Sequence, residues 1–129
     1  MPLDGWDHVE LWVGNAKQAA YYYEHAFGFH RVAYAGPETG VRDRASYVLE
    51  QGEIRLVLSS ALRRDHEIGE FALVHGDGVK DISLRVPDAT EAVRDFLRSG
   101  DVVLLKASRS TRLERLAEAL RSDTVTTKA

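Results

Sequence analysis

The sequence contains no cysteine and no apolar run that approaches the length of a membrane span. Without cysteine, the chain can form no disulfide, no thiolate zinc site and no thiol nucleophile. A spanning helix needs about 20 consecutive apolar residues. The opening residues, MPLDGWDH, have neither the basic nor the apolar region of a signal peptide. We therefore expect a cytoplasmic protein with no membrane partner.

The chain also has no excess of basic residues, because Lys and Arg are scattered among more numerous Asp and Glu and the net charge is −3. A nucleic-acid-binding protein usually presents a clustered basic face. We therefore expect no nucleic-acid partner, and a small molecule or a protein suits the composition better. With 129 residues, the chain has the length of a single domain, 1–129, and can bury a core without cross-links.

A strand followed by a helix is predicted near the N-terminus. From Asp7 to Val13, apolar and polar residues alternate, which is typical of a strand with one buried face. Asn15 is a suitable N-cap, apolar residues then recur at helical spacing, and Gly28 stands where a glycine commonly ends a helix. Three further strands are predicted in FHRVAYAG, RASYVLEQG and EIRLVLSS, which gives a βαβββ module over 7–62.

The pattern begins again after a polar connection at 63–79. The sequence KDISLRVPDATEAVRDFLRSG places Asp81 where His8 stood and Asp88 where Asn15 stood, with apolar residues at matching positions between them. The chain therefore carries an internal repeat of its strand and helix unit.

The second copy is shorter than the first. A complete module needs three strands after its helix, whereas the chain offers one apolar strand at 101–107 and one helix that begins near Thr111. We therefore expect an α+β fold, in which the βαβββ module is followed by an incomplete second module, βαβα, over 80–122. A frayed tail is expected at 123–129.

Three segments, WVGNAKQAAYYY, AYAGPETGVRDRASYVLEQGEIRLVLSSAL and HGDGVKDISLRVPDA, together resemble the N-terminal half of the 4-hydroxyphenylpyruvate dioxygenase family over about residues 7–89. That family belongs to the vicinal oxygen chelate superfamily, and the resemblance implies βαβββ modules that pair into curved sheets around a metal. It also implies that the iron ligands, two histidines and a glutamate, belong to the C-terminal half of those proteins. The sequence shows no counterpart to that half, so no ligand is carried over.

The composition changes near residues 89–100. Beyond Gly100 there is no aromatic residue, proline or histidine, and the net charge changes from negative to positive. The segment SGDVVLLKASRSTRLERLAEAL resembles the C-terminal tail of the UDP-N-acetylmuramoyl-tripeptide D-alanyl-D-alanine ligase family. The chain lacks the glycine-rich phosphate-binding loop that ligase chemistry needs. The two resemblances together imply a chimera without ligase activity.

One metal site is considered. His8 lies where many vicinal oxygen chelate modules place a metal ligand, Glu10 follows on the same strand face, and Asp81 is the repeat equivalent of His8. A lone strand histidine is more often a structural polar residue, because a metal site needs three or more converging ligands. No recognisable spacing joins the other histidines into a ligand set.

Two functions remain open. The favoured one is a non-catalytic or vestigial module that resembles the dioxygenase half and has no catalytic residue and no bound cofactor. The alternative is a small metal-dependent enzyme in which two chains associate and His8, Glu10 and Asp81 bind Fe(II) or another divalent ion. A weaker alternative is a small-molecule binding protein with Trp12 as an aromatic wall. An incompletely covered sheet also predicts a homodimer.

Overall fold

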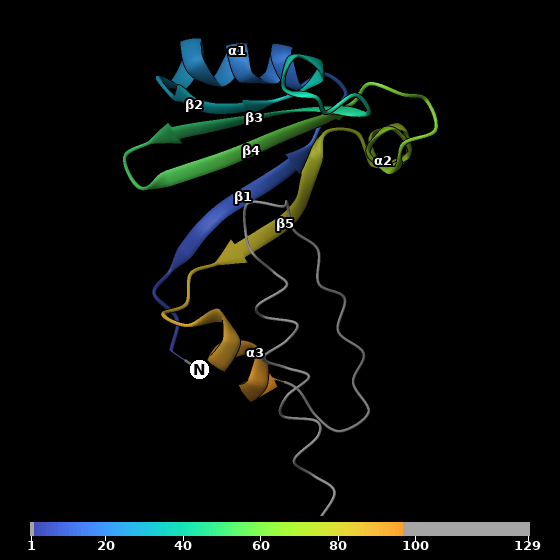
Figure 1. Cartoon of the computed structure of the whole chain (residues 1–129). Coiled ribbons are helices and arrows are strands. Elements are labelled where there is room, and N and C mark those ends of the chain that lie inside the picture. Colours follow the sequence, from blue (N-terminus) through green and yellow to red (C-terminus); the bar gives the residue numbers. More distant parts are fainter. Residues whose placement is uncertain (1, 97–129) are drawn as a thin grey trace, which may run out of the picture. The chain divides into compact units, whose positions relative to one another are not determined.

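The computed structural model describes residues 2–96 (Figure 1). In chain order the elements are β1 (Trp6–Trp12), α1 (Ala16–Phe27), β2 (His30–Ala35), the 3₁₀ helix η1 (Pro37–Thr39), β3 (Arg44–Gln51), β4 (Ile54–Ala61), α2 (Glu67–His75), β5 (Gly78–Leu84) and α3 (Ala89–Phe96). The predicted strands and helices within this range occur in the expected order, and two short helices, η1 and α2, are additional. The fold is α+β, and β1 to β4 with α1 form the predicted βαβββ module. The strand predicted at 101–107 and the helix predicted from Thr111 lie outside the described residues.

The chain divides into two compact units, residues 5–85 and residues 1–4 with 86–129. The first unit contains the whole sheet with α1 and α2, and the second contains α3. No helix within residues 2–96 is both long and apolar enough to cross a membrane.

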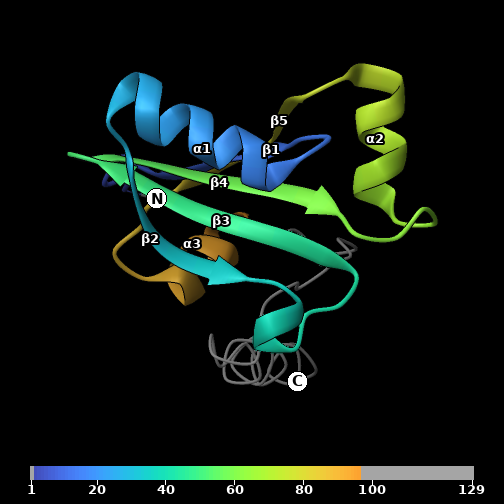
Figure 2. The same cartoon turned by 90° about the horizontal axis from the view of Figure 1, so that it is seen from above.

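The sheet has five strands in the order β2-β3-β4-β1-β5 (Figure 1). Figure 2 shows β2, β3 and β4 side by side. β1 runs parallel to β4 and antiparallel to β5, whereas β3 is antiparallel to both of its neighbours. The second copy of the repeat therefore begins inside the sheet of the first, because β5 pairs directly with β1. β5 starts at Gly78, two residues before the predicted start of the repeat at Lys80.

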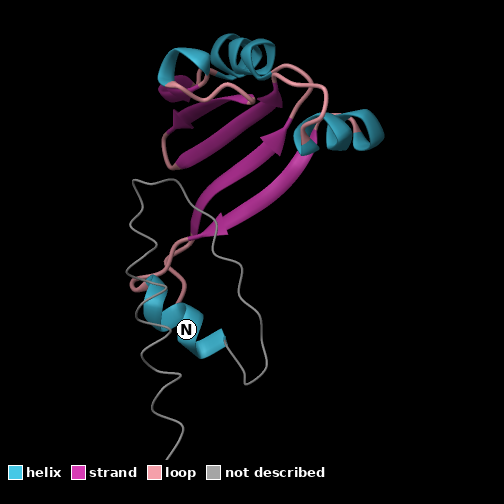
Figure 3. Ribbon diagram, turned by 45° about the vertical axis from the view of Figure 1, so that its right-hand side comes forward, coloured by secondary structure: helices cyan, strands magenta, loops and turns pink. Residues whose placement is uncertain are grey.

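α1 lies on one face of the sheet (Figure 3). The Asn15 side chain accepts a hydrogen bond from the Gln18 amide at 3.0 Å, which satisfies one of the unpaired donors at the helix start. The helix ends at Gly28, whose φ of 74° is left-handed and favours glycine. Ala16 and Ala20 are completely buried, so their small side chains let the helix pack closely against the strands.

The core lies between α1 and the sheet. Tyr23 of α1 packs against it, while Tyr21 and Tyr22 keep 61% and 57% of their surface exposed. This division arises because three consecutive residues of a helix point in different directions. The buried members of the core are Val13, Ala16, Ala20, Ala45, Tyr47, Leu49 and Leu58.

The predicted connection at 63–79 contains α2. The His66 Nδ1 atom accepts a hydrogen bond from the Ile68 amide at 3.2 Å and so caps the start of this helix. Ile68 is buried, with 2% of its surface exposed, and anchors the helix. His66 thus has a structural role at the start of α2.

Candidate functional site

The sheet face opposite α1 is polar over β1 and its neighbours. His8, Glu10 and Trp12 alternate with the apolar residues of β1, whose side chains turn toward the core. On β5, Ser83 lies opposite His8, and Asp81 lies opposite Glu10. Directly opposed residues of antiparallel strands share a face. The three residues singled out from the sequence therefore belong to one surface.

His8 has a partner at each ring nitrogen. Its Nδ1 lies 2.8 Å from Oδ2 of Asp7, and its Nε2 lies 3.2 Å from Oγ of Ser83. The side chains of His8 and Asp7 are 28% and 33% exposed. The imidazole is thus fixed between β5 and the start of β1, while the site stays open to solvent.

Two arginine side chains lie beside the carboxylate of Asp7. The pKa of Asp7 is lowered, and the largest cause is the hydrogen bond from His8. Partial burial acts in the opposite direction but is outweighed. The positive charges of Arg55 and Arg85 lower the pKa further. Arg55 and Arg85 lie 3.4 and 3.6 Å from Oδ1 of Asp7. Asp7 is therefore ionised at neutral pH and can hold the His8 ring in one orientation.

Glu10 belongs to a separate hydrogen-bond network on the same face. Its Oε1 atom accepts from Oγ of Ser59 at 2.9 Å and from Nε1 of Trp12 at 3.2 Å. Ser59 is 1% exposed, and its Oγ also lies 2.8 Å from Oγ of Ser46. The carboxylate thereby satisfies polar atoms of the sheet that would be costly to bury alone.

The residues predicted as metal ligands do not fit a metal as they stand. Glu10 and Asp81 lie opposite each other, but the nitrogens of His8 face Asp7 and Ser83. Within residues 2–96, no three His, Asp or Glu side chains gather in a way that could hold a metal ion. A three-ligand centre therefore needs several groups to exchange their present partners, and we derive no chemistry through it.

Trp12, considered above as an aromatic wall, is largely enclosed. Only 8% of its surface is exposed, and its ring meets that of Phe71 edge to face with centroids 5.5 Å apart. The Lys80 ammonium lies 4.6 Å from the Trp12 ring centroid, a cation-π distance. Trp12 therefore packs α2 and β5 onto β1, and little of its ring remains for a ligand.

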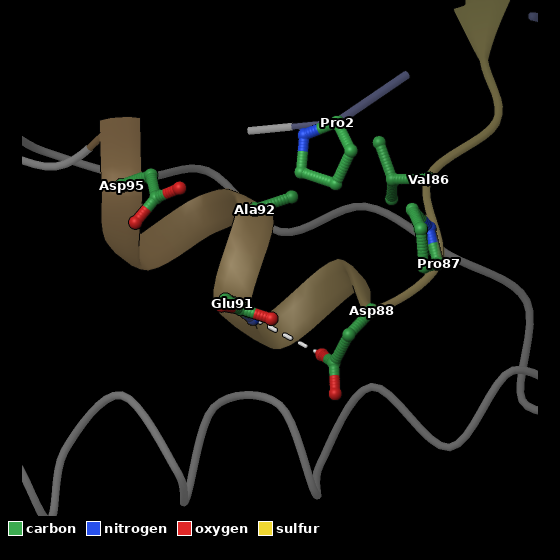
Figure 4. A pocket seen from close by; sticks show the side chains of 7 residues that line it. All are labelled: Pro2, Val86, Pro87, Asp88, Glu91, Ala92 and Asp95. Atoms are coloured by element: carbon green, nitrogen blue, oxygen red, sulfur yellow. Dashed lines mark hydrogen bonds between the residues drawn. The ribbon is translucent and has the colours of Figure 1, made fainter. Parts of the chain in front are cut away.

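A shallow pocket lies in the second unit, around the start of α3 (Figure 4). Asp88 accepts hydrogen bonds from the amides of Thr90 and Glu91 at 2.7 and 3.0 Å, so its Oδ1 atom already caps the helix. This cap is the one that the sequence predicts. The pocket is lined by Pro2, Val86, Pro87, Asp88, Glu91, Ala92 and Asp95.

Sequence reasoning missed Asp7 and Ser83 as partners of His8. The sequence shows Asp7 and His8 side by side at the start of a strand. The third member, Ser83, is brought next to His8 only by the register between β1 and β5. That register contains two irregularities, next to His8 and after Glu10, which a one-dimensional pattern does not show.

The sequence of the chain matches the family described as the Glyoxalase/Bleomycin resistance protein/Dioxygenase superfamily over residues 5–125. Among similar curated proteins, 4-hydroxyphenylpyruvate dioxygenase of Dictyostelium discoideum is 42% identical over 99 residues, covering 76% of this chain and 27% of the relative. The same enzyme of Xenopus tropicalis is 48% identical over 91 residues, covering 70% and 22%. The chain thus spans about a quarter of the length of these relatives.

Solved structures give the same fold. A mutant of 4-hydroxymandelate synthase from Streptomyces coelicolor superposes with a TM-score of 0.68 at 32% identity, covering 72% of this chain and 28% of that chain. Methylmalonyl-CoA epimerase from Mycobacterium tuberculosis superposes with a TM-score of 0.61 at 21% identity, covering 73% and 63%, which shows the fold alone.

The family match extends to residue 125, on both sides of the compositional change near 89–100. These comparisons therefore give no support to a chimera or to a ligase-like tail. The change in composition lies within the residues that a single family matches. The chain belongs to the Glyoxalase/Bleomycin resistance protein/Dioxygenase superfamily.

Proposed function

We propose that this chain is a module equivalent to the N-terminal half of 4-hydroxyphenylpyruvate dioxygenase and has no iron-dependent dioxygenase site of its own. The observation that carries the proposal is that both ring nitrogens of His8 already have hydrogen-bonding partners within the chain. Its two ring nitrogens face Asp7 and Ser83, although His8 occupies the strand position that the family resemblance associates with metal binding. The 42% identity to a dioxygenase over 27% of that protein supports the correspondence with one part of it.

Oxygen consumption tests this proposal. Purified protein is supplied with Fe(II) and 4-hydroxyphenylpyruvate, and oxygen uptake is followed with an electrode. We expect no uptake above that of iron and keto acid without protein. Uptake that needs both iron and the keto acid, and that disappears in His8→Ala, would overturn the proposal. Ser46→Ala is a matched control, because it alters the same sheet face away from His8.

The alternative is a metal site completed by association of two chains, with His8, Glu10 and Asp81 as ligands. Its support is limited to the placement of these residues on neighbouring strands. It predicts stoichiometric Fe(II), Co(II) or Zn(II) in the purified protein, and loss of the metal together with the dimer. Elemental analysis of each fraction from size-exclusion chromatography distinguishes it from the favoured proposal.

A further inference from the structure

Ser83, His8 and Asp7 form a continuous hydrogen-bonded series on the polar sheet face. Oγ of Ser83 is 3.2 Å from Nε2 of His8, and Nδ1 of the same ring is 2.8 Å from Oδ2 of Asp7. A hydroxyl, an imidazole that can take its proton and a carboxylate that orients the imidazole are the parts of an activated serine nucleophile. Such constellations are recognised by geometry and are independent of fold and chain order.

The charge state of Asp7 assigns the direction of the hydrogen bonds. An ionised carboxylate can only accept, so Nδ1 of His8 carries the hydrogen and donates it to Asp7. In the neutral ring, Nε2 then carries the free electron pair. The Ser83 hydroxyl therefore donates to Nε2, which is the arrangement that a general base requires before it removes a proton.

We propose that Ser83 is a reactive nucleophile, with His8 as its general base and Asp7 as the positioning residue, and that it transfers acyl groups from small activated esters. Oγ of Ser83 forms a bond to the acyl carbon while its proton passes to Nε2 of His8. The bond from that carbon to the leaving oxygen then breaks, and the proton is delivered to this oxygen. Water, activated by the same His8, releases the acid and restores Ser83.

The surroundings of the series fit a small ester. Ser83 is partly buried, and His8 and Asp7 are 28% and 33% exposed, so the series is in contact with solvent. Arg55 and Arg85 lie beside Asp7, with side chains that are 39% and 55% exposed. Both guanidinium groups place positive charge beside the series, and Arg55 is also held by a hydrogen bond from its Nε to Glu50 at 2.6 Å.

Labelling by an alkyl fluorophosphonate tests the proposal directly, because this reagent forms a bond from phosphorus to serine oxygen and releases fluoride. The full chain is treated with the reagent, and the site and rate are read by mass spectrometry of the intact protein and its peptides. We expect one label, on Ser83, that is absent in Ser83→Ala and unchanged in rate in Ser46→Ala. Hydrolysis of 4-nitrophenyl acetate is measured in parallel, with the same expected dependence on Ser83.

The dependence on His8 and Asp7 separates an activated serine from a merely exposed one. His8→Gln should slow labelling by about 10²-fold or more, since a positioned general base contributes at least this factor. Asp7→Asn should slow it while Asp7→Glu restores part of the rate, which simple loosening of the strand would not do. Thermal unfolding confirms that each variant is folded.

Two results would overturn the inference. One is folded wild-type protein that stays unlabelled at reagent concentrations that modify a known serine hydrolase, and the other is labelling of Ser83 at equal rates with and without His8. This inference does not depend on the proposed function. Iron-dependent oxygen uptake would contradict the proposed function. The labelling of Ser83 is a separate measurement and tests only the serine nucleophile.

Discussion

At the scale of single residues, the register between β1 and β5 determines which side chains lie beside His8. Its place on a polar strand face follows from the alternation of β1. The internal repeat equates it with Asp81, yet the residue opposite it is Ser83, and Asp81 lies opposite Glu10. The antiparallel pairing is centred on Val9, which lies opposite its own repeat equivalent Ile82. His8 therefore lies opposite the equivalent of Glu10, and Glu10 lies opposite the equivalent of His8. The repeat thus identifies the strands, and only the register identifies the partners of His8.

A second residue contact gives a prediction that does not depend on the site. Tyr34 donates to Oε2 of Glu38 at 2.6 Å, and this hydrogen bond is the main cause that raises the pKa of Tyr34 to about 12. The protonated phenol is favoured in the folded state. Its contribution to stability is therefore complete below the ordinary value of 10.0 and is lost as pH rises toward 12.

We expect Glu38→Gln to return the pKa of Tyr34 toward 10.0, because the amide side chain carries no negative charge to oppose the phenolate. Ultraviolet titration of phenolate formation, with the Tyr34→Phe curve subtracted, measures this residue alone. Identical Tyr34 curves in wild-type protein and Glu38→Gln would show that the contact is not maintained in solution.

At the scale of elements, the first module was predictable because each boundary has a local chemical signal. Asn15 and Gly28 enclose α1, and alternation marks β3 and β4. The inward positions Ala45, Tyr47 and Leu49 of β3 are buried as the pattern indicates, whereas on β4 burial begins only at Leu58. α2 lies within the segment 63–79, for which the sequence predicts only a polar connection. Its N-cap is His66, which is not one of the usual capping residues, so the start signal was weak.

The alternation of β4 predicts unequal costs for two similar substitutions. Leu58 has no exposed surface and belongs to the core, whereas Ile54, on the same side of the strand, is 56% exposed. Leu58→Ala should lower the free energy of unfolding by about 2–5 kcal/mol through lost contacts and a cavity. Ile54→Ala should change it by about 0.5 kcal/mol or less. Urea unfolding of both variants makes the comparison, and equal losses would contradict the burial assigned to β4.

At the scale of the whole molecule, β5 is the last strand of the sheet formed by the described residues. No strand within residues 2–96 pairs with the outer side of β5. Three apolar residues of β5 are about half exposed, Val79 and Ile82 at 54% and Leu84 at 47%. An edge strand with apolar side chains and unpaired backbone groups is a template for further pairing. The sequence could predict that the sheet is incomplete, but not which surface completes it.

This edge leads to a prediction about assembly. We expect a homodimer, since a closed two-fold pair covers the edge on both chains at once. Light scattering after size-exclusion chromatography should give twice the chain mass of 14.4 kDa at high micromolar concentration. Ile82→Lys should shift the protein to the monomer, because a charged side chain would be buried in the pair. Ile54→Lys, at a comparably exposed position on β4, should leave the dimer intact. A strict monomer at every concentration would instead indicate that the edge is covered within one chain, and Ile82→Lys would then lower the melting temperature without changing the mass.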